Sequence, residues 1–169
     1  MAEKRSEPFV VSRVVDAPRE RVWKAWTEAE HLKHWWGPQG FKLHTCKVDL
    51  RPGGVFHYGM TTPDGKDLWG KFMYREIKAP ERLVFIVSFS DPKGGVTRHP
   101  WNDNWPLETL STVTFEEQGG KTKVTVQWIP ADSASDAERK SFDEGRPGMK
   151  QGWGGTMDKL VDYVKKAER

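Results

Sequence analysis

Residues 149–164 have the sequence MKQGWGGTMDKLVDYV, and this stretch decides the fold that we expect. Its apolar side chains recur at the spacing of one helix face, which predicts a helix with a single stripe turned toward a core. The stripe consists of Met149, Trp153, Met157, Leu160 and Val164. Just upstream, Gly145-Arg-Pro-Gly148 is expected to break the helical segment that begins near Asp136, because proline removes a helical hydrogen bond. The packed helix is therefore expected over 149–166.

Before this helix the apolar period changes to two, which indicates β-strands. The expected strands are 9–15, 42–50, 54–61, 67–78, 82–90, 108–117 and 121–129. Two short helices are expected after the first strand. Pro18 lies in the first turn of one, and Thr27-Glu-Ala-Glu30 has the form of a capping box for the other. This order predicts an α+β fold, in which a curved antiparallel sheet of about seven strands wraps on the long C-terminal helix.

The first hairpin after the two helices allows a prediction of strand register. A two-residue loop would pair Leu50 with Val55 and would mix the polar and apolar faces of the two strands. A three-residue loop with a glycine bulge pairs Leu50 with Gly54 and brings the apolar faces together, so we expect this register. Strand 82–90 is apolar on both faces, which predicts that both are covered, one of them by a partner subunit in a homodimer.

The chain has 169 residues, a length typical of one domain. We expect a flexible N-terminal tail over 1–8 and a single domain over 9–167. The only cysteine, Cys46, cannot form an internal disulfide. The core must therefore come from apolar packing.

Charge and hydropathy exclude several classes of partner. The 27 basic and 24 acidic side chains alternate along the chain and leave a net charge of +3, which is typical of a solvated surface. A nucleic-acid binder would have a clustered basic face. No apolar run approaches the ~20 residues of a membrane span, and the start of the chain lacks the apolar core of a secretory signal. We expect a cytoplasmic protein with no nucleic-acid or membrane partner.

Six motifs carry a resemblance to a known superfamily. They are Asp16-Ala-Pro-Arg-Glu-Arg-Val-Trp-Lys-Ala-Trp26, His34-Trp-Trp-Gly-Pro38, Asp49-Leu-Arg-Pro-Gly-Gly54, Pro63-Asp-Gly65, Glu76-Ile-Lys-Ala-Pro-Glu-Arg-Leu83 and Gly152-Trp-Gly-Gly-Thr-Met-Asp-Lys-Leu160. In this order the chain resembles the helix-grip superfamily of START-type lipid-transfer, pollen-allergen and polyketide-cyclase domains. Within it the chain looks like the branch named after activators of the heat-shock chaperone ATPase. The resemblance implies a cavity between the sheet and the final helix.

Two segments depart from the pattern of that family. Residues 91–107 are longer and more aromatic than the corresponding turn, and Pro147 interrupts the last helix. Both departures are expected to reshape the mouth of the cavity.

The nine tryptophans imply either a strongly aromatic core or an aromatic-lined pocket. Gly152, Gly154 and Gly155 each cost the final helix about 1 kcal/mol relative to alanine. They either leave room for a ligand beside Trp153 or let the helix pack closely on Trp35 and Trp36. The sequence leaves both readings open. The expected cavity-lining residues are Trp26, Trp36, Phe56, Tyr58, Phe85, Trp128, Trp153 and Met157, and the expected lid residues are Trp101 and Trp105.

No residues are assigned to catalysis or to a metal, and no cofactor is expected. His31 and His34 share a helix face but lack the further ligands of a metal site. His57 and Asp49 are expected to form an exposed ion pair. The leading hypothesis is a non-enzymatic protein that binds a small hydrophobic or aromatic molecule. A polyketide cyclase-like or hydrolase-like enzyme and a chaperone partner or other protein-interaction module are the alternatives.

Overall fold

The computed structural model describes residues 7–37, 39–100 and 102–167. The elements in chain order are β1 (Phe9–Val15), α1 (Arg19–Thr27), α2 (Ala29–Trp35), β2 (Lys42–Val48), β3 (Val55–Thr61), β4 (Asp67–Lys78), β5 (Arg82–Ser90), β6 (Val96–Thr97), β7 (Thr109–Gln118), β8 (Lys121–Pro130), α3 (Asp136–Glu144) and α4 (Arg146–Ala167). This is the predicted order with one addition, the two-residue strand β6. The α+β fold class is confirmed.

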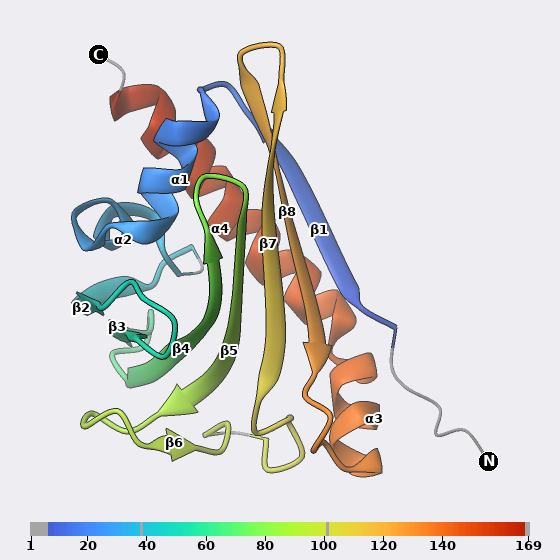
Figure 1. Ribbon diagram of the computed structural model, residues 1–169. Coiled ribbons are helices and arrows are strands. Elements are labelled where there is room, and N and C mark those ends of the chain that lie inside the picture. Colours follow the sequence, from blue (N-terminus) through green and yellow to red (C-terminus); the bar gives the residue numbers. More distant parts are fainter. Residues whose placement is uncertain (1–6, 38, 101, 168–169) are drawn as a thin grey trace.

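One antiparallel sheet curls around α4 (Figure 1). Its strand order is β1-β8-β7-β5-β4-β3-β2, and β6 pairs only with β5. The helices α1 and α2 lie beside one end of α4, and α3 precedes its other end (Figure 1). The edges of the sheet are therefore β1 and β2, while β5 and β7 lie near its middle.

The register predicted for the first hairpin is confirmed. Cys46 pairs with Tyr58, and Val48 pairs with Phe56, so the apolar faces of β2 and β3 coincide. The positive φ of Gly53, 84°, fits the bulged three-residue loop. Because side-chain direction alternates along a strand, this register points Phe56 and Tyr58 toward α4.

The capping box expected at Thr27 is wrong. Thr27 is the last residue of α1, and its hydroxyl donates to the Trp23 carbonyl at 2.9 Å. The N-cap of α2 is Glu28, which makes no side-chain capping bond. The corner between the helices is instead fixed by the Trp35 indole, which donates to the Ala25 carbonyl at 2.9 Å.

The helical break predicted before α4 is present, and it lies at Gly145. Pro147 falls in the first turn of α4, where its missing N–H costs no helical hydrogen bond. The helix therefore starts at Arg146 and not at residue 149. The start of α3 is also as predicted, with Ser135 and Glu138 forming a capping box.

The core lies between the inner face of the sheet and the apolar stripe of α4. Four stripe residues, Trp153, Met157, Leu160 and Val164, are buried there. Burial of each such side chain contributes roughly 1.5–3 kcal/mol. The stripe predicted from spacing is therefore the contact surface of the helix.

The outer face of β5 is already covered within one chain at its centre. Ile86 is 7% exposed and lies between its cross-strand neighbours Met73 and Leu110. The homodimer expected through this face stays a prediction.

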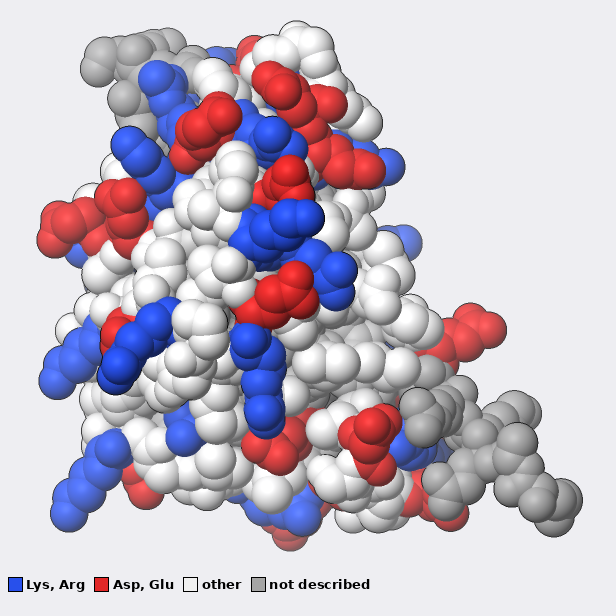
Figure 2. All heavy atoms as spheres, in the orientation of Figure 1, with Lys and Arg blue, Asp and Glu red and all other residues white. Residues whose placement is uncertain are grey.

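The surface mixes charges of both signs, as Figure 2 shows for one face of the molecule. No helix in the described part of the chain is both long and apolar enough to cross a membrane. Residues 1–6 of the expected tail lie outside the described residues, and the Glu7 and Pro8 carbonyls accept hydrogen bonds from Arg146.

Candidate functional site

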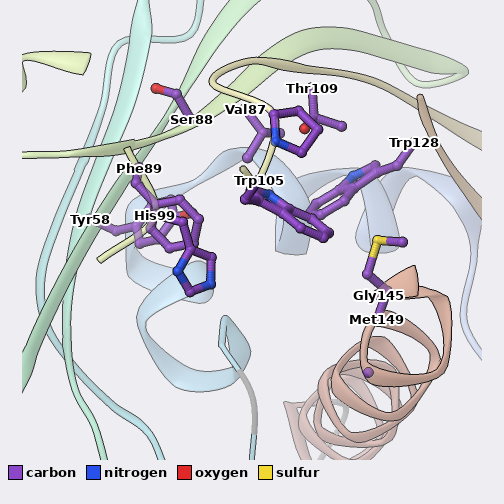
Figure 3. Close-up of a pocket in the computed structure, with 12 residues that line it drawn as sticks. Tyr58, Val87, Ser88, Phe89, His99, Trp105, Thr109, Trp128, Gly145 and Met149 are labelled. Carbon is purple, nitrogen blue, oxygen red and sulfur yellow. The ribbon is translucent and has the colours of Figure 1, made fainter. Parts of the chain in front are cut away.

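A cleft opens between the inner face of the sheet and the first turns of α4. We call its outer part the lid lobe, which has a volume of about 380 Å³. The lid lobe is lined by Tyr58, Val87, Ser88, Phe89, His99, Trp105, Pro106, Thr109, Trp128, Gly145, Gly148 and Met149. In Figure 3, Tyr58, Phe89 and His99 gather on one side, Trp128 and Met149 lie on the other, and Trp105 lies between.

A second part of the cleft, the helix lobe, lies further along α4 and has a volume of about 220 Å³. It is lined by Trp36, Gly37, Tyr58, Met60, Leu68, Phe89, Trp128, Met149, Gly152, Trp153 and Thr156. Tyr58, Phe89, Trp128 and Met149 line both lobes, so the two volumes are neighbouring parts of one cleft.

The position of Tyr58 depends on a glycine in the next strand. Tyr58 pairs with Gly70 of β4, and a Cβ at Gly70 would lie 2.5 Å from the Tyr58 hydroxyl. The ring therefore lies across the bare backbone of β4. A side chain at residue 70 would push Tyr58 into the cleft.

Trp153 joins the core to the helix lobe. On the cleft side its ring is edge-to-face with Trp128 at 5.5 Å and with Trp36 at 5.6 Å. On the core side it stacks with Trp26 at 6.1 Å. Such aromatic pairs contribute about 0.5–1.5 kcal/mol beyond the burial of their area. They hold the Trp153 ring as a fixed wall of the cleft.

The helix glycines have different surroundings. A Cβ added at Gly152 would meet nothing within 4 Å, and Gly152 lines the helix lobe. A Cβ at Gly155 would lie 3.0 Å from Cγ of Gln39. The reading of close packing against Trp35 and Trp36 is therefore not found at Gly152 or Gly155. The absence of a side chain at Gly152 leaves open space in the cleft, and its absence at Gly155 allows the Gln39 side chain to approach the helix backbone.

The segment between β5 and β7, which we call the lid segment, forms one wall of the lid lobe. It is tied to α3 by hydrogen bonds. Glu138 accepts hydrogen bonds from the Arg98 guanidinium and from the Leu107 amide, both at 2.7 Å. Asn102 donates to Ser141 at 2.9 Å. Burial opposes ionisation of Glu138, but the backbone amides of Ser135 and Leu107, with Arg98, outweigh it and lower its pKa to about 2. The lid segment is thus anchored by one ionised carboxylate.

Of the two expected lid residues, Trp105 lines the lid lobe, and Trp101 lies outside the described residues. The Trp105 ring lies 5.8 Å from Phe142 of α3. A Cβ at Gly145 would lie 2.8 Å from that ring. The glycine between α3 and α4 therefore lets the indole approach the backbone at the helical break.

The cleft has two titratable side chains among its described lining residues, Tyr58 and His99. Burial raises the pKa of Tyr58, and the Trp36 indole only partly offsets this. Burial lowers the pKa of His99, whose ring lies 4.7 Å from that of Phe89. Both side chains are therefore neutral at pH 7, and the cleft offers uncharged hydrogen-bonding groups.

The eight predicted cavity residues divide into two groups of four. Trp36, Tyr58, Trp128 and Trp153 line the cleft. Trp26, Phe56, Phe85 and Met157 are at most 1% exposed and form the packed core beneath it. Their role in ligand binding stays a prediction.

Sequence reasoning did not assign Phe89, Met60 or Met149 to the cleft. Phe89 lies four residues beyond Phe85 on the same strand face, so the alternation that selected Phe85 also indicates Phe89. Met149 belongs to the predicted helix stripe, and it is partly buried against the core where it lines both lobes.

The other histidines make local contacts away from the cleft. His31 hydrogen-bonds with the Tyr163 hydroxyl at 2.6 Å, and His34 stacks on the Tyr163 ring. The ion pair expected between His57 and Asp49 is absent from the described contacts, because Asp49 pairs with Arg51 and His57 hydrogen-bonds with Ser90. Among the described residues there is no group of three or more His, Cys, Asp or Glu side chains that could hold a metal ion.

Comparison with known proteins gives one family match. The model of the family described as "Activator of Hsp90 ATPase homolog 1-like protein" matches residues 16–165. A search of curated proteins found no match.

Several solved structures are similar over nearly their whole length. A protein from Arthrobacter aurescens is 27% identical, with a TM-score of 0.76 over 94% of this chain and 86% of that one. A protein from Nitrosomonas europaea is 24% identical, with a TM-score of 0.75 over 95% of this chain and 96% of that one. The AHSA1 protein from Silicibacter pomeroyi is 15% identical, with a TM-score of 0.73 over 95% and 99% of the two chains. The last two likenesses concern the fold alone.

Proposed function

This chain belongs to the family of Activator of Hsp90 ATPase homolog 1-like proteins, and on that premise we propose that it binds a small hydrophobic or aromatic molecule in the cleft between the sheet and α4. The cleft has the features of a small-molecule site, a mainly apolar hollow with a few polar groups. Six Trp, Tyr and Phe rings line its walls, those of Trp36, Tyr58, Phe89, Trp105, Trp128 and Trp153.

One observation carries the proposal. Gly152 lies inside a helix, where glycine costs about 1 kcal/mol relative to alanine, and a Cβ there would meet nothing within 4 Å. A larger side chain at residue 152 would fill this space and improve the packing of the helix. Glycine at this position instead keeps the helix lobe open, as a binding site requires.

The test compares two glycines of the same helix. Gly152→Leu fills the helix lobe, whereas Gly154 does not line the cleft and a Cβ there also meets nothing within 4 Å. Titration with uncharged hydrophobic fluorophores and with a panel of lipids and polyketides should give saturable binding to the native protein. We expect Gly152→Leu to weaken binding by at least about tenfold and Gly154→Leu to change it by less than about twofold.

Failure of the native protein to bind any member of the panel would count against the proposal. So would equal affinity of the two leucine variants. Thermal unfolding of both variants provides the check on folding, because each gains a similar helix propensity.

The enzyme alternative stays a prediction. Cyclase or hydrolase chemistry requires a titratable group whose pKa is shifted toward the operating pH by a neighbouring side chain. The titratable groups that line the described cleft are Tyr58 and His99, and burial holds each of them in its neutral form. Replacing each with Phe and testing turnover of polyketide or ester substrates would examine this alternative.

The chaperone-partner alternative also stays a prediction. Its motive is the family description, which names an activator of Hsp90 ATPase. Pull-down of the full chain from its own cells, followed by identification of any captured chaperone, would test it.

A further inference from the structure

We propose that the cleft selects uncharged ligands and excludes acids and amines of the same shape. This inference rests on the proposed function and adds to it the class of molecule that the site accepts. It is carried by the uncharged lining of the cleft and by the partners of three charged side chains near it, Arg98, Arg146 and Lys159.

The walls of the cleft lack formal charge. No described residue that lines the lid lobe or the helix lobe is Asp, Glu, Lys or Arg. The 27 basic and 24 acidic side chains of the chain therefore lie outside the described lining. A ligand enclosed by these walls would find no counter-ion for an ionised group.

Three charged side chains near the cleft are engaged with partners. Arg98, in the lid segment itself, pairs with Glu138 of α3 at 2.7 Å. Arg146, beside the lining residue Gly145, pairs with Asp143 at 2.9 Å. Lys159, one turn beyond Thr156, donates to the Gly37 carbonyl at 3.0 Å. Recruiting any of these groups to a ligand would break an existing contact.

The polar groups of the cleft suit a neutral ligand. In the lid lobe they are the hydroxyls of Tyr58, Ser88 and Thr109, the Trp128 indole and the His99 imidazole. The helix lobe adds the Trp36 indole and the Thr156 hydroxyl. Burial lowers the pKa of His99, so it offers no positive charge at pH 7. Such groups can bond to a hydroxyl, ether or carbonyl, but an ionised group pays an uncompensated desolvation cost among apolar walls.

The size of the cleft limits the ligand. Small-molecule sites have volumes of roughly 300–1,000 Å³. The lid lobe, about 380 Å³, lies near the lower end of this range, and the helix lobe, about 220 Å³, lies below it. A molecule of two fused or linked aromatic rings fits this scale. All of its substituents then lie inside or at the mouth of the cleft, where their charge matters.

The first experiment uses three probes of one shape: naphthalenemethanol, naphthoate and naphthylmethylammonium, measured by calorimetry on the full chain at pH 7. We expect the alcohol to bind at least about tenfold more tightly than either ion. The biphenyl series with the same three substituents repeats the comparison. Equal affinity for the alcohol and an ion would overturn the inference and leave the proposed function standing.

The second experiment adds the missing counter-ion. Met149 lines both lobes and is partly exposed at the start of α4. Met149→Lys should raise the affinity for naphthoate relative to naphthalenemethanol by at least about tenfold. Met149→Leu is the matched control and should leave that ratio unchanged. Circular dichroism and thermal unfolding check that both variants fold.

The outcomes separate the two proposals. If no probe of either series binds the native protein, the proposed function fails together with the inference. If ions bind the native protein as tightly as the alcohols, only the inference fails. If Met149→Lys leaves the ratio unchanged while the fold is intact, lack of a counter-ion is not the cause of selection.

Discussion

Gly145 shows how one residue positions a wall of the cleft. Its Cα faces the Trp105 ring so closely that a Cβ would lie 2.8 Å from it. Gly145→Ala should therefore displace the ring and lower the free energy of unfolding by about 1–3 kcal/mol, as overpacking does. Urea denaturation followed by tryptophan fluorescence measures both effects.

Gly148→Ala is the control for that substitution. A Cβ at Gly148 would meet nothing within 4 Å, and the residue lies inside α4. We expect this variant to be more stable than the native protein by up to about 1 kcal/mol, from helix propensity. If both alanine variants were equally destabilised, contact with Trp105 would not be the cause.

At the scale of elements, Glu138 joins α3 to the lid segment. Glu138→Gln removes the charge that Arg98 and two backbone amides bond to, so we expect a loss of about 1.5–3 kcal/mol in unfolding free energy. Amide hydrogen exchange should accelerate around Leu107. Glu144→Gln is the control, because Glu144 is exposed and lies 4.0 Å from its partner Lys140.

The same carboxylate predicts an acid dependence of stability. The fold lowers the pKa of Glu138 from 4.5 to about 2. Its contribution is therefore fully present above pH 4.5 and is lost as the pH falls through about 2. As the pH is lowered from 4.5 to about 2, the unfolding free energy of the native protein should fall more steeply than that of Glu138→Gln. Parallel curves would contradict the assignment.

The secondary-structure elements were largely predictable from the sequence. Alternation and helical spacing gave the strands, the first register and the buried stripe of α4, because each depends on neighbours in the chain. The motifs gave the family, which the family match confirms. The division between core and cleft could not be read in this way. Phe85 and Phe89 share one strand face, but only the position of α4 decides that Phe85 is packed and Phe89 lines the cleft.

The contact between Arg98 and Glu138, which anchors the lid segment, could not be predicted from the sequence either. Arg98 and Glu138 are 40 residues apart, and nothing in either segment indicates the other. The strand β6 was missed because two residues are too few for an alternating pattern. The capping box at Thr27 failed because the preceding helix extended through that residue.

At the scale of the whole molecule, the prediction concerns self-association. The sequence predicts a homodimer through the outer face of strand 82–90, yet Ile86 is already 7% exposed in a single chain. The apolar area left for a partner at that residue is small, so we expect association only at high concentration. Light scattering should then show a mass that rises from 19.4 kDa toward twice that value. A constant mass of one chain would contradict the prediction.

The two halves of α4 differ in a way that bears on how a ligand enters. Its first turns carry Gly148, Gly152 and Gly154, around which a Cβ meets nothing, while Leu160 and Val164 are packed in the core. Local opening needs less free energy where fewer contacts break. The helix should therefore have a gradient of protection, with rapid amide exchange over 146–152 and slow exchange from the buried Trp153 onward. Fraying from the first end would widen the entrance to the cleft while the rest of the helix holds the fold together.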